Sequence, residues 1–405
     1  MNSSRRHARW NQLRELAPGR PVLPTVQRRL DRAADLADLR LLARRRAPRM
    51  VFDYVDGGAE AERSLAASVR AFDRVAFHPR VLRDVRETSC STTILGREVS
   101  LPLVLGPTGF TRMMHHEGES GVAAAAQDAG VPYVLSTMGT TTTAGVAAAA
   151  PQGWNWFQLY VVRDRGASRD RIALAREAGM DVLVLTVDTP VAGGRLRDVR
   201  HGMTIPPTLR WGSALQVARH PRWWSRFVTS EPLGFTAAGG AAGDLVGIVN
   251  TLFDPGVTFA DIDWVRSQWQ GSLIVKGIQD VSDAKELASM GVDGIVVSNH
   301  GGRQLDRSPA PLELLPHVRD AVGDSVELYL DGGVRSGADL AAAVALGADA
   351  SFVGRAYLYG LMAGGRRGVD RMMTLFRDEY TRTLQLLGLR STADLGHGAA
   401  SLLDR

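Results

Sequence analysis

The segment Ser298-Asn-His-Gly-Gly-Arg-Gln-Leu-Asp306 places two chemically active side chains three residues apart. Histidine changes protonation state near neutral pH and often serves as a general base, whereas arginine binds a carboxylate through paired hydrogen bonds. The segment follows the apolar run 294–297, which indicates a buried strand, and its glycines permit a tight turn. An isolated histidine after a strand is more often structural. We nevertheless predict that His300 and Arg303 face one small site, because similar strand ends recur along the chain.

Polar residues follow each of the predicted strands, and there are more of them than packing alone requires. Side chains at the carboxyl ends of neighbouring parallel strands meet at one face of a barrel, where such folds bind their ligands. We therefore predict one active site built from these residues: Thr108, Ser136, Gln158 with Tyr160, Thr186 with Asp188, Lys276, His300 with Arg303, Asp331 with Arg335, and Gly354 with Arg355.

The elements that must position these residues alternate regularly. Apolar runs typical of buried parallel strands lie at 101–105, 131–135, 154–159, 182–187, 272–275, 294–297, 326–330 and 350–353. Helical stretches lie between them at 117–129, 140–150, 169–178, 259–269, 280–290, 311–322 and 338–346. An open doubly wound sheet is the rival architecture, but it rarely contains eight such units in this even order. The pattern predicts an α/β fold, a TIM (β/α)8 barrel.

The barrel is predicted to occupy residues 31–390, with one long insertion at about 196–256 after the fourth strand. An Arg- and Pro-rich extension, 1–30, precedes it and is expected to pack on it. Helical periodicity continues this N-terminal extension through 36–71, and a short tail, 391–405, ends the chain.

The insertion is rich in Gly, Pro and Trp, and its tryptophans lie beside arginines. Such a pairing suits the interface of a membrane, where the ring is half buried and the cation meets anionic lipid. A packing loop or a subunit interface would explain the same composition equally well. For the segment 204–245, a membrane contact and a packing loop or subunit interface therefore remain alternative predictions.

Composition argues for a cytoplasmic protein. The single cysteine, Cys90, excludes an internal disulfide and a thiolate metal cluster. No apolar run approaches the length of a membrane-spanning helix, and the basic N-terminus has no hydrophobic segment after it, which disfavours a secretory signal and leaves an organelle transit peptide as a minor alternative. The net charge of +5 comes from scattered arginines, so we expect no nucleic-acid partner. We also expect no metal, because the adjacent His115 and His116 should point apart.

Three further features indicate the type of ligand. The loops Asp331-Gly-Gly-Val-Arg335 and Gly354-Arg355 follow the last two strands, where barrels commonly bind phosphate. Lys276 ends a strand in a chain whose only other lysine is Lys285, and it could form a Schiff base or stabilise an anionic ring. Arg195 can converge with Arg303 on a small carboxylate substrate.

These residues resemble the FMN-dependent α-hydroxy-acid dehydrogenases and oxidases, the family that includes glycolate oxidase and the respiratory L-lactate dehydrogenases. The resemblance covers about residues 30–390, in the family's order. The motifs that carry it are Asp53-Tyr-Val, Gly106-Pro-Thr-Gly, Leu135-Ser, Phe157-Gln-Leu-Tyr, Thr186-Val-Asp-Thr-Pro, Val275-Lys-Gly, Ser298-Asn-His-Gly-Gly-Arg-Gln-Leu-Asp, Asp331-Gly-Gly-Val-Arg and Gly354-Arg.

The resemblance implies a role for each position. His300 would be the base, with Asp188 behind it to stabilise the imidazolium. Arg195 and Arg303 would hold the substrate carboxylate, while Tyr54 and Tyr160 would bond to the carboxylate and hydroxyl. Lys276 would neutralise the negative charge of the reduced flavin. The flavin ring would be surrounded by Pro107, Thr108, Gly109, Ser136, Gln158, Thr186 and Ser298, and its phosphate by Asp331, Gly332, Gly333, Val334, Arg335, Gly354 and Arg355.

Within the family, Gly109 and Gly302 match lactate and mandelate dehydrogenases rather than glycolate oxidases, and the chain looks most like actinobacterial quinone-linked L-lactate dehydrogenases. Met138 departs from the bulky aromatic of plant-type oxidases and leaves the substrate's size open. The expected reaction oxidises an L-2-hydroxy acid, lactate above all, to the 2-oxo acid, by hydride transfer or through a carbanion. A homotetramer with a quinone acceptor, cytoplasmic or peripheral on the inner face of the membrane, is the implied form.

The rival functions are an oxygen-dependent oxidase that releases hydrogen peroxide, and a dehydrogenase of larger, mandelate-like acids. A flavin-binding barrel without catalysis is disfavoured, because base and arginines are all present. A Schiff-base isomerase or aldolase using Lys276 would leave the His–Arg pair half explained.

Overall fold

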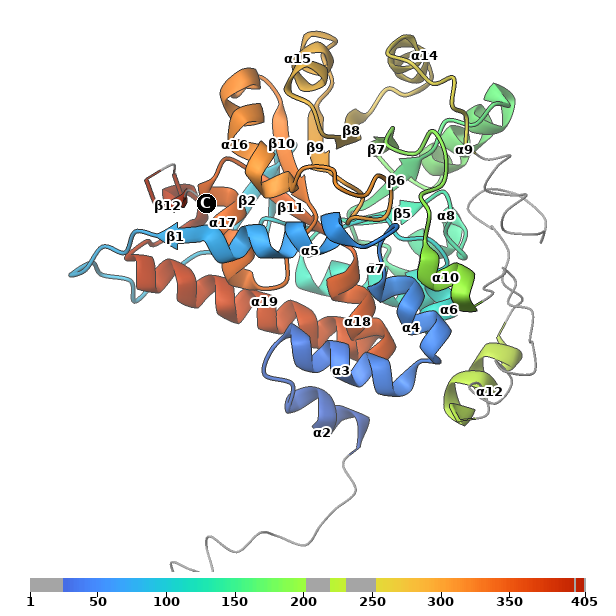
Figure 1. The fold of residues 1–405 in the computed structure, drawn as a ribbon, viewed down its shortest axis with the longest axis horizontal. Helices are drawn as coiled ribbons and strands as arrows, with labels where there is room; N and C mark the ends of the chain where they lie inside the picture. Colours follow the sequence, from blue (N-terminus) through green and yellow to red (C-terminus); the bar gives the residue numbers. More distant parts are fainter. Residues whose placement is uncertain (1–24, 202–218, 231–252, 397, 404–405) are drawn as a thin grey trace, which may run out of the picture.

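The computed structural model describes residues 25–201, 219–230, 253–396 and 398–403. Residues 1–24, 202–218 and 231–252 lie outside the described residues. They include most of the predicted N-terminal extension 1–30 and most of the predicted insertion. Figure 1 shows a central barrel surrounded by helices. The N-terminal helices α3 (Leu36–Arg46) and α4 (Arg49–Asp56) lie beside the C-terminal helices α18 (Arg355–Gly364) and α19 (Arg366–Leu387).

The predicted TIM barrel is confirmed. Eight parallel strands close in the order β10-β11-β4-β5-β6-β7-β8-β9. Their bounds are β4 Leu103–Leu105, β5 Tyr133–Ser136, β6 Asn155–Leu159, β7 Val182–Thr186, β8 Ser272–Ile278, β9 Gly294–Ser298, β10 Glu327–Asp331 and β11 Ala350–Val353. The helices that follow them are α6 Thr111–Met114, α7 Gly118–Ala129, α8 Thr143–Ala149, α9 Arg165–Glu177, α14 Ala260–Gln268, α15 Val281–Ser289, α16 Pro311–Val322 and α17 Gly337–Ala345.

Alternation along each strand divides the core into two parts. One face of the strands packs on the surrounding helices, and the other fills the barrel with large side chains such as Trp156, Tyr329 and Phe352. A hairpin formed by β2 (Thr92–Ile94) and β3 (Arg97–Val99) covers the amino-terminal end of the barrel, because Ile94 and Val99 pack into the same interior cluster. The opposite, carboxyl-terminal end is therefore the end that is open to ligands.

The predicted helical stretch before the barrel is divided into three helices: α3 (Leu36–Arg46), α4 (Arg49–Asp56) and α5 (Arg63–Arg70). Proline at position 48 and the Gly57-Gly58 pair separate them, since neither favours continued helix. A short helix, α2 (Val26–Asp31), precedes them and packs on the C-terminal helices.

Two C-terminal helices were not predicted. They are α18 (Arg355–Gly364) and α19 (Arg366–Leu387), which pack on each other, with α18 also covering α3. The predicted tail returns to the body, because its strand β12 (Ala400–Leu402) pairs antiparallel with β1 (Val75–Phe77). Two helices of the insertion are described, α10 (Leu196–His201) and α12 (Pro221–Thr229). Within the described part of the chain, no helix is both long and apolar enough to cross a bilayer.

Candidate active site

One cavity lies at the carboxyl-terminal ends of the strands and brings most of the predicted site residues together. It is lined by Tyr54, Pro107, Thr108, Gly109, Ser136, Tyr160, Thr186, Lys276, Arg195, His300, Arg303, Asp331, Gly332, Gly333, Val334, Arg335, Gly354 and Arg355. The three remaining predicted residues, Gln158, Asp188 and Ser298, lie directly behind this lining, since each bonds a residue that lines the cavity.

His300 is held in the cavity by an unusual backbone turn. His300, Gly301 and Gly302 all have positive φ angles, of 56°, 64° and 70°. Histidine rarely adopts this conformation, and such outliers persist where the surroundings impose them. Here the His300 N–H donates to Ser298 Oγ at 3.0 Å, and the Gly302 N–H donates to Asn299 Oδ1 at 3.0 Å.

The imidazole of His300 is oriented by a carboxylate. Its Nδ1 lies 2.9 Å from Oδ1 of Asp188, whose side chain is only 3% exposed. Because a carboxylate accepts hydrogen bonds, Nδ1 carries the hydrogen and Nε2 keeps its lone pair. This arrangement supplies a base whose protonated form is stabilised by the buried carboxylate.

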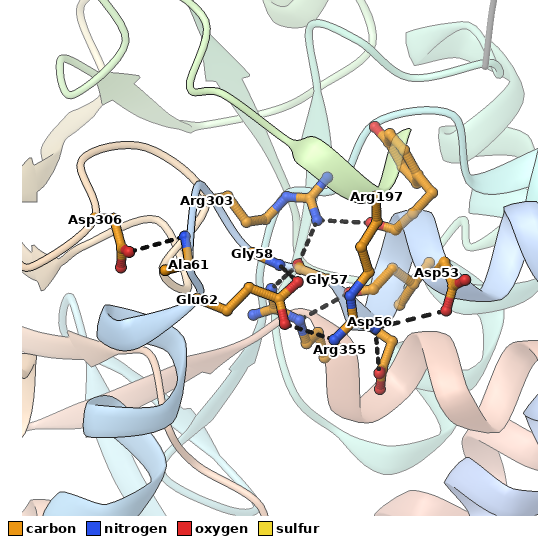
Figure 2. Close-up of polar contacts among 12 residues, drawn as sticks. Asp53, Asp56, Gly57, Gly58, Ala61, Glu62, Arg197, Arg303, Asp306 and Arg355 are labelled. Atoms are coloured by element: carbon orange, nitrogen blue, oxygen red, sulfur yellow. Dashed lines mark hydrogen bonds and ion pairs between the residues drawn. The ribbon is translucent and has the colours of Figure 1, made fainter. Parts of the chain in front are cut away.

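The C-terminal end of α4 holds two of the predicted arginines (Figure 2). NH1 of Arg303 donates to the carbonyls of Tyr54 (2.7 Å) and Gly57 (3.1 Å). Arg355 donates to the carbonyls of Val55 (2.8 Å), Gly57 (2.6 Å) and Gly301 (2.7 Å). The last carbonyls of a helix lack partners within it and lie at its negative end, which suits cations.

Arg355, which is predicted as a phosphate ligand, also has structural contacts. Its guanidinium makes three hydrogen bonds to backbone carbonyls and so joins α4 to the loop that carries His300. The charge still acts on the cavity. Burial, followed by the cations of Arg303 and Arg335, lowers the pKa of Arg355 to about 9. Burial, followed by the positive charge of Arg195, likewise lowers the pKa of Arg303. Such crowded, enclosed cations favour anionic ligands.

Both predicted tyrosines lie beside these cations. The guanidinium carbons of Arg303 and Arg195 lie 4.9 and 5.9 Å from the centre of the Tyr54 ring. Tyr160 is buried, and burial, followed by the charge of Asp188, raises the pKa of its phenol. Tyr160 therefore stays protonated and can donate a hydrogen bond. Nε of Arg195 is buried without a partner among the described residues, as expected of a group that awaits an anion.

Lys276 is paired rather than free. Its ammonium lies 2.7 Å from Oδ2 of Asp331 and 3.0 Å from Oγ of Ser298. Burial alone would lower the pKa of Lys276, but the carboxylates of Asp331 and Asp188 offset it, and the pKa is raised above its ordinary value. The amine is thus protonated, which disfavours the Schiff-base interpretation, because that chemistry needs a neutral amine.

The donor groups of the cavity wall fit the ring system expected from the resemblance. Gln158 is fully buried, and its Oε1 accepts from Ser136 Oγ (3.0 Å) and the Thr137 N–H (3.1 Å). Its Nε2 has no partner among the described residues, and neither does Oγ1 of Thr186. Unpaired buried donors are costly, so a bound heterocycle with acceptor atoms would satisfy them. Lys276 adds a cation to the lining of the cavity, and the glycines after β10 and β11 add backbone N–H groups.

Some residues of the cavity were not predicted. Val55, Phe110, Phe253 and Leu358 also line it, beside Met138. Phe110 follows the Gly106-Pro-Thr-Gly motif directly, so its place after a strand end was a usable signal. Phe253 comes from the end of the insertion and packs edge-on against Tyr160, with ring centres 5.2 Å apart. No local sequence pattern distinguishes Phe253, because the contact joins distant segments.

The expectation that His115 and His116 point apart is wrong. Their Nδ1 atoms are 3.1 Å apart, because the Gly118 N–H donates to the His115 carbonyl and closes a turn in which side chains do not alternate as they would in a strand. Polar atoms of His115, His116 and Glu117 lie within 4.8 Å of one another. Burial, aided by His116 and Arg226, lowers the pKa of His115 to about 3. Arg226 also contacts Nε2 of His116 at 3.2 Å.

The barrel, the His300–Asp188 pair and the unpaired buried donors of this cavity fit a flavin-dependent oxidoreductase. Comparison with known proteins makes this specific. Residues 43–402 match the family model described as FMN-dependent dehydrogenase. The chain belongs to the FMN-dependent dehydrogenase family, and its cofactor is FMN.

Related proteins cover nearly the whole chain. A Mycobacterium tuberculosis protein named "Putative L-lactate dehydrogenase" is 49% identical over 95% of this chain and 94% of its own length. An L-lactate dehydrogenase of Caulobacter sp. is 43% identical over 91% of this chain and 98% of its own length. Among solved structures, the monotopic membrane protein (S)-mandelate dehydrogenase is 33% identical, with a TM-score of 0.86 over 92% of this chain and 100% of its own. A mandelate oxidase is 36% identical, with a TM-score of 0.79 over 91% of this chain and 98% of its own.

Proposed function

We propose that this FMN-dependent 2-hydroxy-acid dehydrogenase oxidises L-lactate to the 2-oxo acid and passes the electrons to a quinone. The observation that carries the proposal is that the His300–Asp188 pair faces the same cavity as Arg195, Arg303, Tyr54 and Tyr160. A base beside two arginines and two phenols matches a small acid that carries a hydroxyl on the neighbouring carbon.

Each side chain has a distinct task. Arg303 and Arg195 bind the carboxylate, and Tyr54 adds a hydrogen bond to it. Tyr160, kept protonated by burial, bonds to the hydroxyl. Nε2 of His300 removes a proton from the substrate, and Asp188 stabilises the imidazolium that results. FMN, when bound, accepts the two electrons and delivers them to the acceptor. Lys276, which is protonated, would hold its positive charge near the bound ring and stabilise negative charge on it.

Apolar groups line the cavity beside the polar ones. Phe110, Met138 and Phe253 supply a surface for the side chain of a substrate such as L-lactate. The relatives at the highest identities given above are named lactate dehydrogenases, which supports the same substrate. A mandelate-like acid is the second candidate, because the solved relatives act on mandelate by name.

Substrate comparison separates these candidates. We expect kcat/KM for L-lactate to exceed that for (S)-mandelate by about tenfold or more, since a pocket that fits a methyl group would have to repack around an aromatic ring, at a cost of about 1–3 kcal/mol. Steady-state assays with a quinone analogue as acceptor measure both values. A preference for (S)-mandelate would contradict the lactate assignment while leaving the chemistry in place. Release of peroxide in step with turnover in air would favour the oxidase instead.

We further propose that α12 contacts a membrane surface, and the solved (S)-mandelate dehydrogenase is named a monotopic membrane protein. The described part of the insertion exposes Val228 (59%) and Trp224 (36%), while Trp223 turns inward and donates to the Met113 carbonyl at 3.1 Å. In Figure 1, α12 lies apart from the barrel, at the periphery of the molecule. Apolar side chains on such a helix suit the lipid interface. The homotetramer implied by the resemblance remains a prediction.

Sedimentation with vesicles tests the membrane contact. The double variant Trp224→Ser/Val228→Ser should reduce the fraction bound to phosphatidylglycerol vesicles by about fivefold, because about 2 kcal/mol or more of apolar burial is lost. Leu386→Ser is the matched control, since Leu386 is 71% exposed on α19, away from α12. Equal vesicle binding by the wild type, the double variant and the control would contradict the assignment of α12 as the membrane contact.

A further inference from the structure

The helix that directly follows Arg195 has no buried side chain that would hold it against the rest of the protein. α10 spans the six residues Leu196–His201, and none of them is buried. A helix of this length is unstable without tertiary contacts, and no apolar face anchors this one. The backbone of Arg195 belongs to this unit, because its carbonyl accepts hydrogen bonds from the Asp198 N–H (3.1 Å) and the Val199 N–H (3.2 Å). Whatever holds α10 therefore also holds Arg195.

Polar contacts to α4 and to the loop after it keep α10 in place. Arg197 reaches Oδ2 of Asp56 at 3.1 Å, Oδ1 of Asp53 at 3.5 Å and Oε2 of Glu62 at 2.5 Å. His201 adds a contact from Nε2 to Oδ2 of Asp53 at 2.7 Å. Figure 2 shows Arg197 between the carboxylates of Asp53, Asp56 and Glu62. We call this set of five residues, Asp53, Asp56, Glu62, Arg197 and His201, the α4–α10 latch.

Asp56 makes the α4 side of the latch rigid. Its side chain is 7% exposed and accepts from Arg40 Nε (2.6 Å) and NH2 (2.8 Å) and from Tyr359 OH (2.8 Å). Burial would raise the pKa of Asp56, but the hydrogen bonds from Arg40 and Tyr359 outweigh it, and the pKa is lowered. This carboxylate is thus a fixed, ionised anchor that α3 and α18 hold in place.

The same end of α4 carries the rest of the carboxylate-binding groups. Tyr54 lies between Asp53 and Asp56 in the sequence, and its ring is 5.9 Å from the Arg195 guanidinium carbon. The carbonyls of Tyr54 and Gly57 hold Arg303. A latch at this point fixes the position of Arg195 relative to both Tyr54 and Arg303, although its own side chains do not line the cavity.

We propose that Arg197 is a positioning residue that holds Arg195 at the substrate carboxylate by tying α10 to α4. The inference rests on the proposed function, in which Arg195 binds that carboxylate. Loss of Arg197 would leave Arg195 in the chain but let it sample orientations that do not face the substrate. The affinity for the substrate would fall by the fraction of time spent in those orientations.

Kinetics of the FMN-loaded enzyme with L-lactate test the proposal. Arg197→Met should raise KM about tenfold and change kcat less than about threefold, because pre-organisation of the ground-state clamp is lost rather than the base. Arg200→Met is the matched control, because Arg200 is an exposed arginine of the same helix and is not a member of the latch. It should keep KM within about twofold. Glu62→Gln removes one contact at the more exposed edge of the latch, and it should raise KM about threefold even where Arg197→Met folds poorly.

A double-mutant cycle separates positioning from a direct role. If Arg197 acts through Arg195, then Arg195→Met/Arg197→Met should show the KM of Arg195→Met alone. A double variant whose KM is the product of the two single effects would overturn the latch. So would an unchanged KM in both Arg197→Met and Glu62→Gln while Arg195→Met raises it. If Arg195→Met itself leaves KM unchanged, the assignment of Arg195 to the carboxylate fails, and the latch fails with it.

Discussion

Replacing His300 with alanine is expected to lower kcat for L-lactate by about 10³-fold while FMN stays bound. The imidazole lines the cavity, and Oδ1 of Asp188 lies 2.9 Å from its Nδ1, so the proposed base would have a carboxylate beside its protonated form. Alanine keeps the cavity wall intact, because the backbone bonds of this turn come from the His300 N–H and from Asn299 rather than from the ring.

Flavin absorbance and anaerobic single-turnover reduction measure the two parts of this prediction separately. His317→Ala, at an exposed position on α16, is the control for a general effect of losing a histidine. A His300→Ala protein that is replete with flavin and reduced by L-lactate at the wild-type rate would remove His300 from the role of base.

Arg303→Lys should raise KM for L-lactate about 30-fold or more, with a smaller effect on kcat. NH1 of Arg303 is occupied by the carbonyls of Tyr54 and Gly57, so the rest of the fork remains for the carboxylate. A lysine cannot serve both partners at once, because its charge is one point without the planar fork. A lost charge-assisted hydrogen bond costs about 1.5–3 kcal/mol, which corresponds to the expected range.

Arg307→Lys is the matched substitution on the same loop, at an exposed position, and should leave KM unchanged. Titration of the oxidised enzyme with a 2-oxo acid, followed by flavin absorbance, measures carboxylate binding without turnover. Wild-type affinity in Arg303→Lys would show that the carboxylate is bound elsewhere.

The barrel and most of the site could be predicted from the sequence because both depend on short-range patterns. Each buried strand is a run of apolar residues. The residue that directly follows a strand lies at the carboxyl-terminal end of the barrel, so its position can be predicted without knowing the other contacts of the chain. Thr108, Ser136, Lys276 and His300 reach one cavity for this reason alone. The closed strand order then follows from the even alternation of strands and helices.

The supporting contacts depend on segments far apart in the chain, and no local pattern encodes them. The carbonyls at the end of α4 hold Arg303 and Arg355 from some 250 to 300 positions away. Phe253 reaches Tyr160 only after the insertion returns to the barrel. Arg355 was predicted as a phosphate ligand from its place after the last strand, but its geometry is set by Val55, Gly57 and Gly301.

An anaerobic absorbance spectrum of the FMN-loaded protein, recorded before and after addition of L-lactate, tests whether the His300 site oxidises this substrate. Lactate is expected to bleach the flavin within the turnover time. A quinone analogue should then restore the colour rapidly, and air only slowly. Rapid recolouring in air with stoichiometric peroxide would contradict the quinone acceptor. A flavin that no 2-hydroxy acid bleaches would contradict the catalytic role of the His300 site itself.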